Sequence, residues 1–273
     1  MASTQDLDLY RFIQIPATDE VPYSFCIGKY PVTNAQYERF LNVPDFGNEI
    51  LWRGFFKFNE NCIEFGRWES EGWEWFQEKS KESTLIKPQD WTDPNFGISN
   101  PENPVVGISW YEANAYCNWL LRHWNEMAES KANTGLRPSS IRLPLETEWV
   151  TAAGGEMPQN RFPWDVTGEE ATDTKEIIKR ANVKEGGIGH TTPVNAYLRG
   201  ASPHGVMDMG GNVWEWQANY RNWKEGTLGL RGGSWDEFGG SARVSVRDYF
   251  HPDLRFYDLG FRVIVPLSRE ASL

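Results

Sequence analysis

The stretch Gly205–Gln217 reads GVMDMGGNVWEWQ and sets glycine and asparagine residues directly before closely spaced aromatic residues. Glycine and asparagine favour tight turns, and aromatic residues favour strands. Similar short aromatic segments, separated by Gly, Pro and Asn, continue up to Val265, so we expect short antiparallel strands joined by turns. Two further strands are expected nearer the N-terminus, at Arg11–Ile15 and Ser24–Tyr30.

Three segments are predicted to form helices. Ser109 and Glu112 are spaced as a capping box, in which each side chain bonds the backbone N–H of the other residue. Apolar residues then recur at three- and four-residue spacing as far as Trp124, which indicates one buried stripe. Glu146–Ala153 is expected to form a second helix, and Thr33 to cap a shorter one. Two main helices among many short strands indicate an α+β fold that is rich in loops.

Residues 43–103 are rich in tryptophan and glycine and show no sustained helical periodicity. A stretch of this length without structure of its own is uncommon in a compact domain. We therefore expect it to pack against the rest of the chain or to carry function. No repeat and no Ser/Gly-rich linker divides the sequence, so we expect one domain over residues 1–273 with residues 43–103 as an insertion.

The composition argues against several classes of partner. The formal net charge is −11 and no local cluster of lysine and arginine offsets it, which disfavours binding to anionic nucleic acid. No apolar run approaches the roughly 20 residues of a membrane-spanning helix. Residues 1–9 lack the basic and apolar regions of a signal peptide. We expect a cytoplasmic protein that binds neither nucleic acid nor membrane.

The three cysteines, Cys26, Cys62 and Cys117, are far apart and form no CxxC motif. Their odd number and their spacing fit neither a zinc site nor a disulfide framework. We expect them to be free thiols in a reducing compartment.

Six segments of the sequence are similar to motifs of the formylglycine-generating-enzyme family, the sulfatase-modifying factors. They occur in the order found in the family and span nearly the whole chain, which makes the resemblance specific. The resemblance implies a C-type-lectin-like core with little regular secondary structure. The six segments are Ile27–Leu41 (IGKYPVTNAQYERFL), Asn103–Leu120 (NPVVGISWYEANAYCNWL), Arg142–Gly155 (RLPLETEWVTAAGG), Gly205–Gln217, Arg231–Trp235 (RGGSW) and Gly260–Val263 (GFRV).

Members of this family that oxidise a substrate cysteine use two cysteines of their own, five residues apart, which bind copper as thiolates. The matching positions in this sequence are Glu237 and Ala242. A carboxylate and a methyl group can neither hold Cu(I) nor provide thiol chemistry, so we expect no copper and no oxidase activity.

Two other catalytic patterns are missing from the sequence. The related iron-dependent sulfoxide synthases use a histidine triad with an HxxxH pair, and serine hydrolases use a GxSxG motif; neither pattern occurs here. An enzyme or enzyme accessory with altered chemistry, using residues 43–103 as a lid, remains the alternative to a non-catalytic protein.

The resemblance also implies a structural calcium ion, which prefers hard oxygen ligands of mixed charge. The implied ligands are the side chains of two acidic residues and two backbone carbonyls, from Asp208, Glu215, Gly211 and Val213. In the alternative interpretation, the two carboxylates only bind local protein donors. A second calcium site of the family would begin at Asn182, but its downstream aspartate is missing and only Glu185 could replace it.

The segment Arg231–Val263 also resembles the variable region of proteins diversified by retroelements, in which a reverse transcriptase mutates adenines in asparagine codons. Those proteins share this fold and have RGGSW and GFRV on either side of the diversified stretch. Residues with the spacing of the constant frame are Arg243, Arg247, Pro252-Asp253 and Arg255. The residues between them are reachable from an asparagine codon, except Glu237. The candidate ligand-binding residues are Asp236, Glu237, Phe238, Gly240, Ser241, Val246, Asp248, Tyr249, Phe250, His251, Leu254, Phe256, Tyr257 and Asp258.

The composition of these candidate residues suits a binding surface. Aromatic side chains give large, stiff contact areas at low entropic cost, while aspartate, serine, glycine and histidine provide adaptable polar contacts. Because alternate residues of a strand point inward, about half of the aromatic residues could instead belong to the core. The frame arginines are expected to be structural and paired with carboxylates such as Asp253. We therefore predict a non-catalytic protein that binds a protein or peptide ligand.

Overall fold

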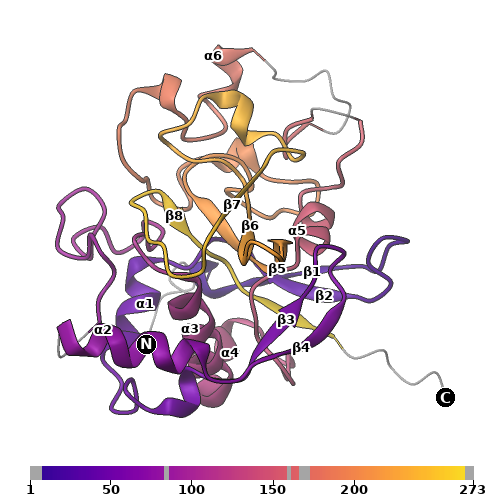
Figure 1. Ribbon diagram of the computed structural model, residues 1–273. Coiled ribbons are helices and arrows are strands. Elements are labelled where there is room, and N and C mark those ends of the chain that lie inside the picture. The colour runs from indigo at the N-terminus through magenta and orange to yellow at the C-terminus, as the bar shows by residue number, and fades with distance from the viewer. Residues whose placement is uncertain (1–7, 83–85, 159–160, 166–172, 268–273) are drawn as a thin grey trace.

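The computed structural model describes the chain except for residues 1–7, 83–85, 159–160, 166–172 and 268–273 (Figure 1). In the described ranges the helices are α1 (Asn34–Leu41), α2 (Glu71–Glu82), α3 (Trp110–His123), α4 (Ala128–Ala132), α5 (Glu146–Ala152) and α6 (Thr174–Ile177). The strands are β1 (Phe12–Ile15), β2 (Phe25–Gly28), β3 (Phe55–Phe58), β4 (Glu64–Trp68), β5 (Trp214–Asn222), β6 (Thr227–Arg231), β7 (Arg247–Phe250), β8 (Leu259–Gly260) and β9 (Ile264–Pro266).

The predicted caps define where α3 and α1 begin. The Ser109 hydroxyl accepts a hydrogen bond from the backbone N–H of Glu112 at 3.3 Å, and Oε2 of Glu112 accepts one from the backbone N–H of Ser109 at 2.7 Å. These two bonds satisfy N–H groups that lack a partner within the helix or at its start. Thr33 and Gln36 form the same motif at α1. Residues 110–117 are all buried, so α3 lies in the middle of the core.

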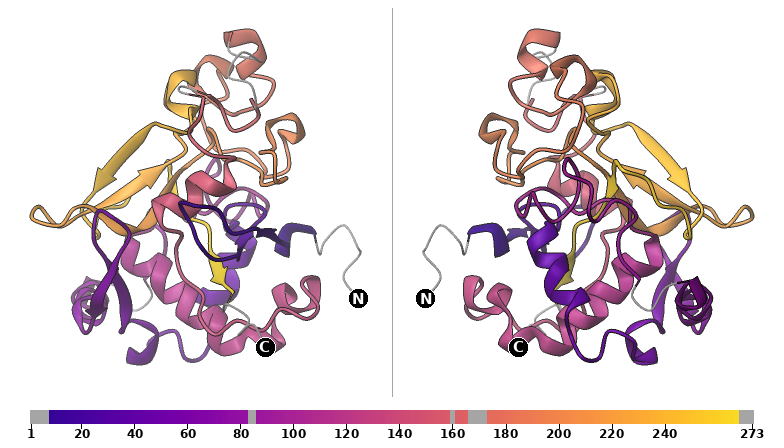
Figure 2. Two further views of the ribbon diagram at one scale, coloured as in Figure 1. Left: turned by 90° about the vertical axis from the view of Figure 1, so that its right-hand side faces the viewer. Right: turned by 90° about the vertical axis from the view of Figure 1, so that its left-hand side faces the viewer.

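A small antiparallel sheet in the order β1-β2-β9 joins the two ends of the described chain. Ile15 pairs with Phe25, and Ile27 pairs with Ile264. Figures 1 and 2 show the indigo strands β1 and β2 beside the yellow end of the chain. Both N-terminal strands predicted from the sequence are confirmed.

The larger sheet has the order β4-β3-β5-β6-β7, with β8 pairing β5. Most of its neighbours are antiparallel, as predicted, but β3 pairs β5 in parallel through Phe58 and Asn219, and β8 pairs β5 in parallel through Leu259 and Trp214. The alternation of residues along a strand does not reveal the direction of its neighbour, so the sequence could not predict these two pairs. Figure 2 shows the β3–β4 hairpin on the same side of the molecule as β6 and β7.

The stretch 43–103 packs against the core, as expected, but it is not free of regular structure. It contains β3, β4 and the helix α2. The sequence contains no clear signal of α2, because only Gly72 and Trp75 are buried along its twelve residues. Trp52, Trp68 and Trp91 join the main hydrophobic cluster together with α3.

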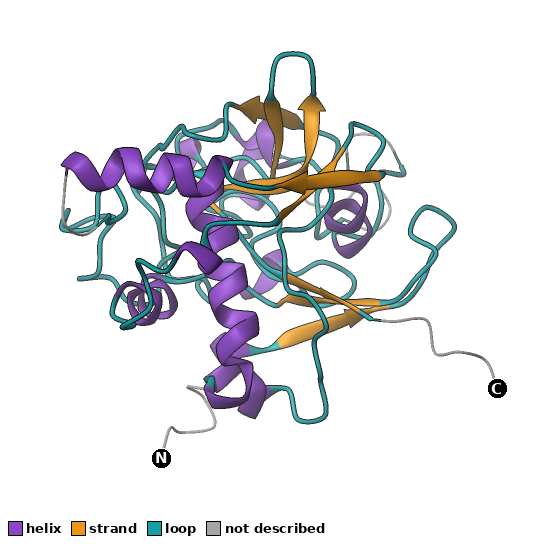
Figure 3. Ribbon diagram, turned by 60° about the horizontal axis from the view of Figure 1, so that its bottom comes forward, coloured by secondary structure: helices purple, strands orange, loops and turns teal. Residues whose placement is uncertain are grey.

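Loops join most of the elements and make up much of the chain (Figure 3), in agreement with the predicted loop-rich fold. None of the helices in the described ranges is long and apolar enough to cross a membrane.

Candidate functional site

Glu215 lies at the start of β5 with no exposure to solvent. Its Oε1 accepts a hydrogen bond from Nη2 of Arg262, and its Oε2 accepts one from Nε of Arg262, both at 2.6 Å. The indole N–H of Trp149 donates to Oε2 at 2.9 Å. These three donors occupy three of the roughly four lone-pair positions of a carboxylate.

Asp208 lies in the turn before β5, with a left-handed backbone at φ = +52°. Its Oδ2 accepts a hydrogen bond from Nδ2 of Asn212 at 2.9 Å. Burial raises the pKa of Asp208 to about 7. This desolvation outweighs the hydrogen bond from Asn212 and the attraction of Arg262, which both lower the pKa.

These contacts test whether Asp208 and Glu215 suit calcium. Among the described residues Asp208 forms no direct ion pair, although the charge of Arg262 lowers its pKa, whereas Glu215 is paired directly with Arg262. The Gly211 carbonyl accepts a hydrogen bond from the backbone N–H of Val213 at 2.9 Å. Across the described ranges no group of three or more His, Cys, Asp or Glu residues is arranged to hold a metal. The calcium site stays a prediction with four candidate residues. Of these, Glu215 already accepts three hydrogen bonds from protein donors.

The start of the second implied calcium site contains an oxygen without a partner. Asn182 is buried, and its Nδ2 donates to the carbonyl of His190 and to Oδ1 of Asn212, but its own Oδ1 accepts no hydrogen bond within the described structure. Glu185, the only candidate to replace the missing aspartate, instead accepts a hydrogen bond from the backbone N–H of Gly239. The carboxylate of Glu185 therefore supports the segment that contains the candidate binding residues.

The two positions that match the family's catalytic cysteines both lie within that segment. Glu237 is half-buried, and Ala242 is buried at the end of the turn Gly239–Ala242. The three thiols of the chain do not substitute for them: Cys26 lies in β2, Cys62 between β3 and β4, and Cys117 in α3. Burial raises the pKa of all three, that of Cys26 to about 11.

None of the fourteen candidate ligand-binding residues is buried. Of the five aromatic ones, Phe250 and Phe256 are half-buried; they pack on each other with ring centres 4.6 Å apart and against the main hydrophobic cluster. The alternative that about half of the aromatic candidates belong to the core is therefore supported in part. The most exposed of the fourteen are Phe238, Tyr249, His251, Leu254 and Tyr257.

Contacts bring the beginning and the end of the segment together. The hydroxyl of Tyr257 donates to Oδ2 of Asp236 at 3.1 Å, and Oγ of Ser234 donates to Oδ2 of Asp258 at 2.8 Å. Tyr249 lies elsewhere: on β7 it alternates with Asp248 and Phe250, so it points to the opposite face of the strand. The candidate residues therefore do not share one continuous face.

Two of the three frame arginines pair with carboxylates, as predicted, but neither pairs with Asp253. Arg247 forms an ion pair with Glu146 of α5, and Arg255 lies 2.8 Å from Oε1 of Glu112, the capping residue of α3. The guanidinium of Arg243 lies over the ring of Phe162 at 5.0 Å.

Comparison with known proteins shows which family the chain belongs to. Residues 3–267 match the model of the sulfatase-modifying factor enzyme 1-like domain. The chain belongs to this family. The resemblance of the six segments is thereby confirmed.

Two curated relatives of this sulfatase-modifying factor-like chain differ in what their names describe. It is 29% identical over 271 residues to a hercynine oxygenase of Mycolicibacterium smegmatis, and the match covers 88% of the chain and 52% of the relative. It is 28% identical over 271 residues to the inactive C-alpha-formylglycine-generating enzyme 2 of Mus musculus, covering 90% and 77%. The chain thus spans about half the length of the hercynine oxygenase.

Two solved structures share the fold of this sulfatase-modifying factor-like chain. Treponema denticola variable protein 1 has a TM-score of 0.59 at 18% identity, and PvdO from Pseudomonas aeruginosa has 0.56 at 21%. In both cases the match covers 94% of this chain and 92% of the other. The C-type-lectin-like fold of the formylglycine-generating-enzyme type is confirmed.

One aromatic residue beside the candidate segment 236–258 was not predicted from the sequence. Phe96, from the stretch 43–103, stacks on Trp235 with ring centres 5.6 Å apart and lies 6.0 Å from the ring of Tyr257. Lys184 completes the surface nearby: its ammonium lies 3.2 Å from Oδ1 of Asp236. No local pattern pointed to Phe96, because its partners are more than a hundred residues away in the sequence.

Proposed function

We propose that this chain is a non-catalytic member of its family that binds a protein or peptide ligand through surface residues between 236 and 258. The observation that carries the proposal is the replacement of the two catalytic cysteines by Glu237 and Ala242, in a segment whose candidate residues all reach the surface.

The loss of catalysis is supported by the chemistry of the two positions. Ala242 is 1% exposed and has no group that could bind a metal or react. Glu237 supplies a hard carboxylate where Cu(I) prefers soft sulfur. The name of the relative from Mus musculus describes an inactive enzyme, so loss of activity has a precedent in the family.

A binding role is supported by the exposed side chains. Phe238 is 64% exposed and Tyr257 is 42% exposed, and the ring of Tyr257 lies beside that of Trp235. Exposed aromatic rings that are grouped, unlike single ones, are typical of contact surfaces. The carboxylates of Asp236 and Asp258 add polar contacts beside them. Aromatic anchors with polar neighbours on a rigid scaffold are typical of protein-binding surfaces.

Diversification by a retroelement forms part of the proposal. It is supported by the spacing of the frame arginines and by the fold shared with a protein named variable protein 1. The genomic test is a nearby copy of the segment with asparagine codons at the candidate positions, next to a reverse transcriptase gene. Absence of both the copy and the gene would contradict diversification.

The binding proposal is tested with peptides selected from a display library against the whole protein. Clones that bind the wild type should lose binding to a variant with Phe238→Ala and Tyr257→Ala. They should keep binding to Phe65→Ala, which removes an aromatic residue that is 56% exposed on β4. Clones that bind all three proteins equally would place the binding surface elsewhere.

The alternative, a divergent enzyme, is favoured by the similarity to the hercynine oxygenase. Metal analysis of the purified protein separates the two functions. We expect less than stoichiometric copper and iron and no turnover of cysteine-containing peptides. One equivalent of either metal, retained through purification, would favour the enzyme.

A further inference from the structure

A cleft of about 710 Å³ opens between the β3–β4 turn, α5, and the ends of β6 and β7. We call it the α5 cleft. Its volume lies within the range of about 300–1,000 Å³ that is typical of small-molecule sites. Apart from the frame residue Arg247, its lining includes no residue between 236 and 258, so it is distinct from the proposed binding surface.

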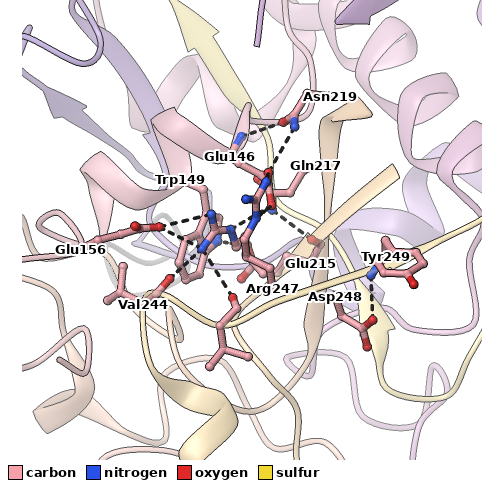
Figure 4. A network of polar contacts seen from close by, with 12 residues as sticks. Glu146, Trp149, Glu156, Glu215, Gln217, Asn219, Val244, Arg247, Asp248 and Tyr249 are labelled. Carbon is pink, nitrogen blue, oxygen red and sulfur yellow. Dashed lines mark hydrogen bonds and ion pairs between the residues drawn. The ribbon is translucent and has the colours of Figure 1, made fainter. Parts of the chain in front are cut away.

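The floor of the α5 cleft is a network of buried charges around Glu146. Nε of Arg231 lies 3.0 Å from Oε1 of Glu146, and Nε of Arg247 donates to the same oxygen at 2.9 Å. A second bond joins Arg247 to Oε2 of Glu146. Glu146 and Arg231 are each 3% exposed. Figure 4 shows these contacts as dashed lines around Glu146 and Arg247.

Two guanidinium groups share Glu146, so the charge balance of the floor depends on a second carboxylate, that of Glu156, which pairs with Arg231. Burial lowers the pKa of Arg231, and the charge of Arg247 beside it adds to this, against the attraction of Glu146. A buried excess charge is unfavourable unless a counter-ion compensates it. The floor therefore favours an anionic group.

Glu156 now occupies the position of that anion, but only loosely. Its Oε1 lies 3.3 Å from Nη1 and 3.4 Å from Nη2 of Arg231, and its side chain is 47% exposed. Bonds between a guanidinium and a well-placed carboxylate are normally about 2.7–2.9 Å long. Within the described structure, Nη1 of Arg247 makes no hydrogen bond, which leaves a further donor for an anion.

The rest of the lining includes acidic and apolar residues, in contrast to the two arginines of the floor. Glu20 and Glu60 bring further carboxylates to the cleft, and Val150 and Met157 provide apolar surface. With Glu146 and Glu156, the lining holds more acidic than basic residues, so a doubly charged anion would be repelled. A ligand with one carboxylate and one cationic group would match both the arginines of the floor and the acidic residues Glu20 and Glu60.

We propose that the α5 cleft binds a small zwitterion, an amino acid or short peptide with apolar side chains. Its carboxylate replaces Glu156 on Arg231 and Arg247, and its ammonium group lies near Glu20 and Glu60. The proposal is independent of the proposed function, because it concerns a different site.

The experiment compares three forms of one probe by titration calorimetry with the full chain. The probes are the dipeptide Leu-Leu, its N-acetyl derivative and its C-terminal amide. We expect the free dipeptide to bind at least about tenfold more tightly than either blocked form, since each block removes one charged contact. Equal affinity of the three forms, or no heat from the free dipeptide up to about 10 mM, would overturn the proposal.

Variants locate the binding. Arg247→Gln should weaken binding of Leu-Leu about tenfold or more, and Glu156→Gln should strengthen it several-fold by removing the internal competitor. Glu20→Gln, which alters an exposed residue, should weaken binding without disturbing the fold. Glu78→Gln on α2, far along the chain and fully exposed, is the matched control and should change nothing. Unchanged affinity in Glu156→Gln and Glu20→Gln would exclude the α5 cleft as the site.

Discussion

Arg262 holds Glu215 through two hydrogen bonds of 2.6 Å, and neither side chain has any contact with solvent. The same guanidinium also donates to the backbone carbonyls of Gly28, Met207 and Asp208. The Arg262 side chain of the GFRV motif thereby connects β2, the turn before β5 and the start of β5.

Removal of Arg262 should therefore be costly. Arg262→Ala leaves Glu215 as a buried charge without its partner and leaves three carbonyls without a donor, so the free energy of unfolding should fall by about 3–5 kcal/mol. Urea denaturation measures this loss. As a control, Arg67→Ala removes an exposed pair with Glu64 and should cost less than about 1 kcal/mol. Similar losses in both variants would contradict the importance assigned to Arg262.

Calcium, if bound as the family resemblance implies, should stabilise the folded chain. Because an ion that binds only the folded state adds to its stability, we expect a chelator such as EGTA to lower the melting temperature of wild-type protein. Asp208→Asn, which removes one ligand charge, should make the melting temperature insensitive to the chelator. A melting curve of the wild type that EGTA leaves unchanged rules out the calcium site.

The proposed loss of copper chemistry depends on two positions, Glu237 and Ala242. The double variant Glu237→Cys/Ala242→Cys restores the thiol pair of the family, and soft thiolates bind Cu(I). We expect it to bind one equivalent of Cu(I) that the wild type does not, measured by competition with a chromophoric chelator. The single variants serve as controls and should bind far more weakly. Failure of the double variant to bind would show that further residues of the copper site have been lost.

Phe96 should contribute to the binding surface although it lies far away in the sequence. Phe96→Ala removes its stacking on Trp235 and its tilted contact with the ring of Tyr257. Each such aromatic pair is worth about 0.5–1.5 kcal/mol beyond the buried area. Peptides selected on the wild-type surface should bind this variant several-fold more weakly. Phe65→Ala, on β4, is again the control. Equal binding to wild type and Phe96→Ala would show that this ring has no part in recognition.

The sequence predicts well those features that depend on neighbouring residues. The caps at Ser109 and Thr33 each join a residue to another three positions away, and both helices begin where predicted. The strands β1 and β2 follow from their own residue types. The order of the six motifs was sufficient to indicate the family, because the order of motifs along a chain is kept even where overall identity is low.

Features that depend on distant residues could not be predicted. The helix α2 buries only Gly72 and Trp75, so its formation follows from its position on the core and not from its own pattern. Arg247 binds Glu146, about a hundred residues earlier, because the fold brings α5 under β7. The α5 cleft arises from the same contact, and no motif in the sequence indicates it.

The anchoring of Arg247 and Arg255 has a consequence for how the segment can evolve. Each of these arginines is held by a carboxylate from outside the segment, Glu146 at α5 and Glu112 at the cap of α3. The course of the chain between them is thus held by these two ion pairs. If the segment is diversified as we propose, substitutions at its exposed positions leave both ion pairs intact, so that the bound ligand can change while the fold is kept.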